Sequence, residues 1–213
     1  HMNKISVILA DDHAVVRMGF KLLLQDTKDI AVVGEAESGE EVIKLLNTLT
    51  ADIIVMDLSM PGIGGLETIS RVVSKAKSPK ILILSAHEDA IHPKRSLKAG
   101  ANGYLSKRGA PEELIKAIRQ IHSGNMYIEP SIAQKVAMSQ MGGETSPVEV
   151  LSEREFDVFM ALASGKTVNQ IAETLHLSPR TVGTHLYNIK QKLNASNQTE
   201  LALIAIKSGL INP

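Results

Sequence analysis

The sequence predicts a five-stranded, doubly wound parallel α/β sheet followed by a small all-α domain of four helices. Three observations support this fold class. Short β-branched runs alternate with amphipathic stretches of helical period through residue 123. The predicted strands are apolar almost throughout, which is typical of a parallel sheet covered on both faces. From Leu151 onward only helical patterns with short connections remain.

The first domain, residues 3–123, contains five predicted strands, each followed by a predicted helix. The strands are expected at residues 5–10, 30–35, 52–56, 80–84 and 103–105, and the helices at 15–25, 40–49, 66–74, 90–99 and 112–122. Ligands of such sheets bind beyond the carboxyl ends of the strands. The residues that follow each strand are therefore the first candidates for a functional site.

Residues 124–147 are expected to form a helix, 130–141, and a flexible linker, 142–147, rich in glycine and polar residues. The second domain, residues 148–213, begins its helices with capping residues. Serine or threonine followed three residues later by Glu or Gln forms a capping box, and Pro is favoured at the first helical position. These signals are Ser152 with Glu155, Thr167 with Gln170, Ser178 before Pro179, and Asn197 with Glu200.

Composition limits the possible function classes. The 213 residues hold 23 Lys plus Arg and 23 Asp plus Glu, and 44% are hydrophobic, which excludes a disordered polyelectrolyte. The zero net charge gives no overall basic excess of the kind that nucleic-acid binding favours. The absence of Cys excludes disulfides and fits a cytoplasmic location. No apolar run reaches the roughly 18 residues of a membrane span, so no membrane partner is expected.

Acidic residues follow two of the predicted strands. Asp11 and Asp12 come directly after the first strand and Asp57 after the third, while Ser85 ends the fourth and Lys107 follows the fifth. Converging carboxylates repel one another and favour a divalent cation such as Mg²⁺. A hydroxyl and an ammonium opposite them could hold a phosphoryl group on a carboxylate. Each Asp alone could equally be a helix cap, but five such residues at four strand ends favour a site.

With the segments MDLSMPG at 56–62 and YLSK at 104–107, these residues resemble a CheY-like receiver domain of two-component systems. The resemblance implies that Asp57 is the phosphoacceptor and that no catalysis occurs beyond self-phosphorylation, so the protein is not expected to be an enzyme. It implies Mg²⁺ bound by Asp11, Asp12, Asp57 and the backbone carbonyl of Ser59. It also implies that Ser85, Lys107 and Tyr104 bind the phosphoryl group or change conformation with it.

In the second domain, the predicted helices 168–175 and 179–193 form a helix-turn-helix, whose second helix enters the DNA major groove. An apolar stripe recurs on that helix at Val182, Leu186, Ile189 and Leu193. No acidic residue lies between Glu173 and Glu200, whereas Arg180, Lys190 and Lys192 all do. The net charge of the whole chain is zero, but this helix carries a local excess of positive charge.

The run from Leu151 to His185 (LSERE…GK…NQIA…LSPRTV…H) resembles the DNA-binding domain of the LuxR/NarL/FixJ class. The resemblance implies that Thr184 and Tyr187 face base edges, with Gly183 beside them where many relatives carry a longer basic side chain. It implies mainly phosphate contacts for Arg180, Thr181, Lys190 and Lys192. It further implies dimerisation through the last helix, with Ala202, Ile206 and Leu210 as candidates.

Across both domains the sequence is similar to two-component response regulators of the NarL/FixJ family, and in particular to the GacA/UvrY/LetA type. This implies a hybrid sensor histidine kinase as partner, a homodimer on double-stranded DNA, and promoters of regulatory RNAs as targets. We therefore expect a transcription factor switched by aspartyl phosphorylation. Two alternatives are a receiver that acts chiefly through protein partners, with the helical domain as interaction module, and a Mg²⁺-dependent phosphohydrolase.

Overall fold

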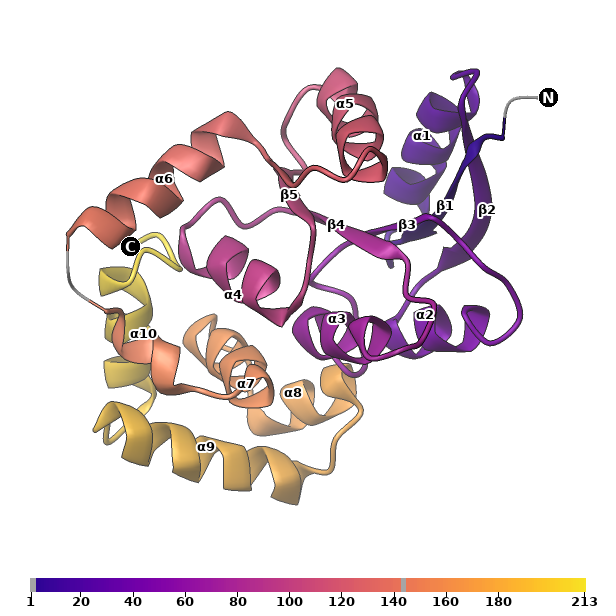
Figure 1. Cartoon of the computed structure of the whole chain (residues 1–213). Coiled ribbons are helices and arrows are strands. Elements are labelled where there is room, and N and C mark those ends of the chain that lie inside the picture. The colour runs from indigo at the N-terminus through magenta and orange to yellow at the C-terminus, as the bar shows by residue number, and fades with distance from the viewer. Residues whose placement is uncertain (1–2, 143–144) are drawn as a thin grey trace.

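The computed structural model describes residues 3–142 and 145–213, and the first domain is a parallel sheet between two layers of helices (Figure 1). The strand order is β2-β1-β3-β4-β5-β6. The strands are β1 (Ile5–Ala10), β2 (Ile30–Ala36), β3 (Ile53–Met56), β4 (Lys80–Ser85), β5 (Gly103–Ser106) and β6 (Tyr127–Ile128). The predicted fold class is confirmed. The sheet has one strand more than predicted, because the two residues of β6 are too few to show a strand pattern.

Helices cover both faces of this sheet because its strands alternate their buried side chains between two cores. Val7 and Leu9 pack in one core with residues of α1 (Ala14–Gln25) and α5 (Pro111–His122). Ile8 and Ala10 pack in the other with residues of α2 (Gly39–Leu45), α3 (Gly65–Val73) and α4 (Ile91–Ala99). Helix α2 ends four residues earlier than the sequence predicts, in a turn at residues 46–48.

The remaining chain is helical. Its elements are α6 (Pro130–Met141), a 3-10 turn at η1 (Pro147–Val150), α7 (Glu153–Ala163), α8 (Val168–Leu175), α9 (Pro179–Leu193) and α10 (Gln198–Lys207). Both predicted capping boxes form at the starts of α7 and α8. Of the predicted linker 142–147, residues 143 and 144 lie outside the described part of the chain. Within that part, no helix is both long and apolar enough to cross a membrane.

The helical domain packs against the α3 and α4 side of the sheet (Figure 1). One hydrophobic cluster therefore runs from the receiver core, including Ile69 and Ile83, into the second domain, including Phe156, Ile171 and Val182. The carboxyl ends of the strands lie beside this contact, since the loop after β3 contacts α7 and α8. The fold thus brings the predicted receiver site close to the second domain.

Candidate phosphorylation site and DNA-binding helix

Three carboxylates meet at the carboxyl ends of β1 and β3. These strands are neighbours, with Ala10 opposite Met56, so the residues that follow them converge. Ligand atoms of Asp11, Asp12 and Asp57 lie within 4.8 Å of one another. Asp57 is 2% exposed and Asp11 5%, whereas Asp12 faces solvent. The sequence prediction that these residues form one acidic pocket is matched by the geometry.

Lys107 reaches into this pocket from the end of β5. Its Nζ lies 2.8 Å from Asp57 Oδ2 and 2.7 Å from Asp11 Oδ2. Burial raises the pKa of Asp57, although hydrogen bonds from Lys107 and the Ser59 backbone act in the opposite direction. Burial disfavours the ammonium form of Lys107, but its bonds to Asp11 and Asp57 outweigh this and raise the pKa of Lys107. Lys107 thus balances buried negative charge.

The residues of the pocket fit Mg²⁺, a hard cation that prefers a few carboxylates and several waters. The donor atoms are carboxylate oxygens, and the Asp12 side chain is 32% exposed, so water reaches the pocket. The Ser59 amide donates to Asp57 Oδ1 at 3.1 Å, which places that peptide beside the pocket. A ligand role for the Ser59 carbonyl remains a prediction.

Ser85 and Tyr104 are linked through His87, in the loop after β4. Both side chains are fully buried. The His87 amide donates to Ser85 Oγ at 3.0 Å, and the Tyr104 hydroxyl donates to the His87 carbonyl at 2.6 Å. Movement of the Ser85 hydroxyl toward a phosphoryl group would therefore remove one support of the segment that also holds Tyr104.

Two residues outside the predicted site, His13 and Arg17, also shape the pocket. His13 Nδ1 lies 3.2 Å from Asp11 and 3.3 Å from Asp12. Arg17 donates to the Asp11 carbonyl at 2.5 Å and pairs with Glu35 of β2 at 3.0 Å. The adjacency of His13 to two aspartates was a usable signal. Nothing in a single sequence pairs Arg17 with a strand 18 residues away.

Helix α9 presents its polar side to solvent. Val182 and Ile189 are fully buried, whereas Tyr187 is 65% exposed and Thr184 is exposed next to it. Arg180 and Thr181 are exposed at the start of the helix and Lys190 is half-buried. A Cβ on Gly183 would meet no atom within 4 Å, so packing does not require glycine there. The predicted contact residues therefore share an accessible helix.

Two predicted residues have other partners within the domain. Lys192 donates to Glu155 of α7 at 2.6 Å, so its charge is already paired. Leu210, a candidate for dimerisation, is 8% exposed and packs in the domain core. Leu203 on α10 is 49% exposed and was not predicted. The other two candidates, Ala202 and Ile206, are half-buried, so Leu203 is the most exposed of these side chains of α10.

Polar contacts at the start of α3 join the two domains. Arg154 of α7 donates to the carbonyls of Gly62 and Ile63 at 3.1 and 2.6 Å. The Gly62 amide donates to the Thr174 carbonyl of α8 at 3.0 Å. These bonds hold the segment that follows the Asp57 loop. These contacts are not predictable from the sequence, because the pattern of one chain does not show which domain surfaces meet.

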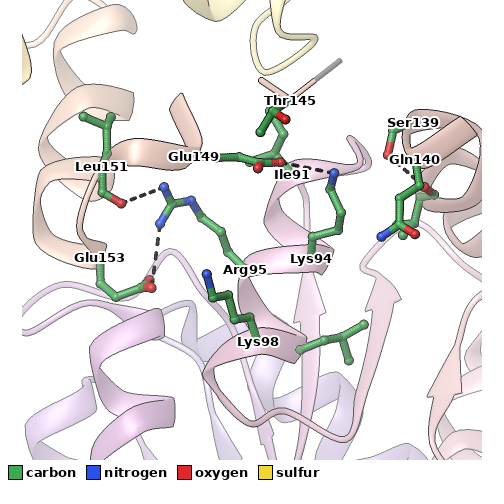
Figure 2. Close-up of a pocket in the computed structure, with 12 residues that line it drawn as sticks. Ile91, Lys94, Arg95, Lys98, Ser139, Gln140, Thr145, Glu149, Leu151 and Glu153 are labelled. Atoms are coloured by element: carbon green, nitrogen blue, oxygen red, sulfur yellow. Dashed lines mark hydrogen bonds and ion pairs between the residues drawn. The ribbon is translucent and has the colours of Figure 1, made fainter. Parts of the chain in front are cut away.

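A second group of contacts joins α4 to the start of the helical domain, around a cavity of about 640 Å³. Arg95 donates to the carbonyls of Val148 and Leu151 at 2.7 and 2.9 Å, and its guanidinium lies 4.3 Å from the Phe156 ring centroid. Figure 2 shows Arg95 pointing toward Leu151, and Lys94 reaching Glu149 at 3.3 Å. Helix α4 is thus bound on its outer face.

Known protein families match both the domain that holds the acidic pocket and the domain that holds α9. Residues 7–119 match the response regulator receiver domain, and residues 149–205 match the bacterial regulatory proteins of the luxR family. The chain belongs to the response regulators, with an N-terminal receiver and a C-terminal luxR-type DNA-binding domain.

Within that class, the chain is a homologue of UvrY and GacA. It is 44% identical to response regulator UvrY of Escherichia coli K12, over 98% of this chain and 96% of the relative. It is 39% identical to response regulator GacA of Pseudomonas aeruginosa, over 98% of each. The structure is similar to that of the Salmonella typhimurium RcsB response regulator, with a TM-score of 0.75, 28% identity, and coverage of 97% and 99%.

Proposed function

We propose that Asp57 accepts a phosphoryl group from a sensor histidine kinase, and that this switches dimerisation and sequence-specific DNA binding through α9. The observation that supports this most directly is the buried Asp57 carboxylate, held 2.8 Å from Lys107 and beside Asp11. The proposed units are the receiver at 3–123, a helix and linker at 124–147, and the DNA-binding domain at 148–213.

In the proposed reaction, a carboxylate oxygen of Asp57 attacks the phosphorus of a phosphohistidine. The P–N bond breaks, and the departing imidazole nitrogen takes up a proton. Lys107 holds Asp57 before the reaction and can pair with a phosphoryl oxygen afterwards. Asp11, Asp12 and Asp57, with the Ser59 carbonyl, would hold Mg²⁺, which supplies positive charge to the phosphoryl oxygens. The Ser85 hydroxyl donates a hydrogen bond to a phosphoryl oxygen of the product.

The exposure of α9 indicates how phosphorylation acts. Tyr187 and Thr184 are already accessible in the arrangement with both domains packed together. Phosphorylation therefore need not uncover the helix. We propose that it releases the α7 and α8 contacts, so that two copies can pair and read two half-sites together.

The comparisons support this proposal. Four of the solved RcsB structures are described as bound to DNA, two of them to promoters in the presence of the phosphomimetic BeF₃⁻. One of the four is described as two RcsB dimers bound to two parallel DNAs. We extend DNA binding and homodimer formation to this chain, and we propose promoters of regulatory RNAs as its targets, as the GacA/UvrY/LetA resemblance implies.

Phosphorylation is tested with acetyl phosphate and Mg²⁺ on the full chain. Asp57→Asn is expected to abolish incorporation, detected as a mass shift of the intact protein, because the nucleophilic carboxylate is gone. Asp26→Asn, at an exposed aspartate outside the pocket, is the matched control and should incorporate normally. Full incorporation in Asp57→Asn would contradict the assignment.

DNA binding is tested by a mobility shift on candidate promoters before and after phosphorylation. Thr184→Ala and Tyr187→Ala should each weaken sequence-specific binding by about 1–3 kcal/mol if these side chains face base edges. Lys207→Ala, at an exposed lysine of α10, should leave sequence preference unchanged. Absence of any sequence preference would favour the alternative in which the helical domain is a protein-interaction module.

A further inference from the structure

A second group of metal-ligating side chains lies outside the acidic pocket. His87, Asp89 and His92 come from the loop after β4 and the first turn of α4. One ligand atom of each lies within 4.8 Å of the others. The two imidazole rings are stacked, with centroids 3.8 Å apart and an angle of 3° between their planes. The proposed phosphoryl transfer uses none of these three side chains.

Both carboxylate oxygens of Asp89 have partners in the structure, one in a helix cap and the other in a contact with His92. Asp89 Oδ1 accepts the amides of Ile91 and His92, both at 2.8 Å, and so caps the start of α4. Its other oxygen, Oδ2, lies 2.7 Å from His92 Nδ1. Imidazole nitrogens and carboxylate oxygens are common ligands of transition-metal ions.

A cavity of about 200 Å³ adjoins this group. It is lined by His87 and His92 from the receiver and by Asp157 from α7. Asp157 Oδ2 is enclosed and has no hydrogen-bond partner among the described residues. Buried carboxylate oxygens without a partner are rare, and each needs an explanation such as an ion or ordered water. The cavity is large enough for an ion with bound water.

We propose that His87, His92 and Asp89 bind one divalent transition-metal ion, best matched by Zn²⁺, with Asp157 accepting a hydrogen bond from a metal-bound water. Two imidazoles and one carboxylate, with an open position for water, are a ligand set that Zn²⁺ takes. The acidic pocket offers mainly oxygen and suits Mg²⁺ instead. Binding requires the stacked rings to turn so that their lone pairs converge, and the hydrogen bond between Asp89 Oδ2 and His92 Nδ1 to open to the ion. His87 is half-buried in a loop, which allows its ring to turn.

The position of the ion would connect the two functional parts of the chain. The His87 carbonyl accepts the Tyr104 hydroxyl, and the His92 ring meets Phe156 of α7 edge-on at 5.1 Å between centroids. An ion at this site therefore orders the segment between the phosphoryl-binding residues and the DNA-binding domain. Metal occupancy would change how readily the domains separate.

The test uses the full chain with excess Mg²⁺, so that the acidic pocket is occupied. Co²⁺ is titrated and its visible absorption recorded, and Zn²⁺ is then added to displace it. One Co²⁺ ion per chain is expected to bind, with the intense visible absorption bands that Co²⁺ shows when its coordination number is low. His87→Ala should weaken binding at least about tenfold. Asp157→Asn should weaken it about 10–100-fold, as changes to outer hydrogen-bond partners do. His122→Ala, at an exposed histidine of α5, is the matched control.

Unchanged Co²⁺ absorption in His87→Ala would overturn the proposal, as would loss of the signal in Asp12→Ala alone, which would assign the ion to the acidic pocket. Because His92 is buried, His92→Ala is interpreted only with a native circular dichroism spectrum. Asp89→Asn keeps the capping oxygen and removes the charge, so it gives a second, milder test. Weakened Co²⁺ binding in Asp89→Asn is expected, and equal binding would count against the site.

Discussion

The ammonium group of Lys107 lies between Asp57 and Asp11, 2.8 Å from Asp57 Oδ2 and 2.7 Å from Asp11 Oδ2. Since Asp57 is the proposed nucleophile, its proton affinity bears directly on the reaction. Burial raises the pKa of Asp57, and the hydrogen bond from Lys107 opposes that rise. Lys107 therefore has a role before phosphoryl transfer as well as after it.

Lys107→Ala should raise the pKa of Asp57 further, because the opposing hydrogen bond and positive charge are removed. Asp57 then stays protonated up to a higher pH. The rate of phosphorylation by acetyl phosphate should therefore fall most strongly at the acidic end of the pH range tested. The pKa is measured without Mg²⁺ by following the Asp57 carboxyl carbon in an NMR titration. Arg108→Ala, which removes the neighbouring exposed cation, should leave it unchanged.

At the scale of single elements, α1 is distinctive for an apolar stripe that faces solvent. Val15, Met18 and Leu22 are 86%, 56% and 62% exposed at helical spacing on a helix that begins beside the acidic pocket. A kinase that delivers a phosphoryl group to Asp57 must approach this edge. The stripe is therefore a fitting contact surface for the kinase.

The double variant Met18→Lys and Leu22→Lys should slow phosphotransfer from the cognate kinase by about tenfold or more, a loss of about 1.4 kcal/mol. Phosphorylation by acetyl phosphate, which needs no docking, should remain normal. Transfer rates are compared on gels with radiolabelled kinase. Val73→Lys, at an exposed apolar residue of α3, serves as control. Equal slowing with both donors would locate the defect in the pocket.

Helix α9 contains an unconstrained glycine in its interior. Gly183→Ala should stabilise the second domain by about 0.5–1 kcal/mol, because glycine in a helix loses more backbone entropy than alanine. The new Cβ meets no atom within 4 Å. Urea unfolding of the full chain measures the change. Gly65→Ala is the contrasting control, since its Cβ would lie 2.6 Å from Leu58 Cα, and it should destabilise.

The ion pair between α7 and α9 should make stability depend on pH. Burial acts to raise the pKa of Glu155, but hydrogen bonds from Lys192 and the Ser152 backbone outweigh it and the pKa is lowered. A lowered carboxyl pKa contributes stability at neutral pH that is lost as pH falls below the ordinary value of about 4.5. Glu155→Gln should therefore cost about 1 kcal/mol at pH 7, and the difference from wild type should shrink toward pH 3 in urea titrations.

Most elements were predictable because their signals are local. The capping boxes at Ser152 and Thr167, and Pro179 at the start of α9, placed the helices of the second domain to within a few residues. The acidic pocket was predictable because parallel strands end at one edge of the sheet. The strand β6 has too few residues to be predicted. Arg17 and Arg154 could not be predicted because Arg17 pairs with a side chain of another strand and Arg154 with carbonyls of the other domain.

At the scale of the whole molecule, Arg154 and Arg95 are two arginines that each donate to two carbonyls across the domain contact. Arg154→Ala removes hydrogen bonds to two receiver carbonyls and should shift the equilibrium toward separated domains by about 2 kcal/mol, or roughly 30-fold. Small-angle scattering should show a larger radius of gyration without phosphorylation, and DNA binding should become less dependent on it. Arg71→Ala, whose recorded ion pair is with Glu67 of the same helix, should leave both properties unchanged.

An unchanged radius in Arg154→Ala would mean that the α4 contacts of Arg95 are sufficient to hold the domains together. Because Arg154 also donates to the Leu175 carbonyl within its own domain, the melting temperature is measured alongside. If the domains separate while the melting temperature is unchanged, the loss of the contacts between the domains, and not of the Leu175 hydrogen bond, is the cause.

The accessibility of α9 has a consequence for the speed of the response. Under the proposed function, copies that have received no signal would already make weak, charge-driven contacts with DNA and move along it. The search for an operator would then precede the stimulus. The delay between stimulus and transcription would depend on phosphoryl transfer and on the pairing of two nearby copies, and much less on the time needed to find the promoter.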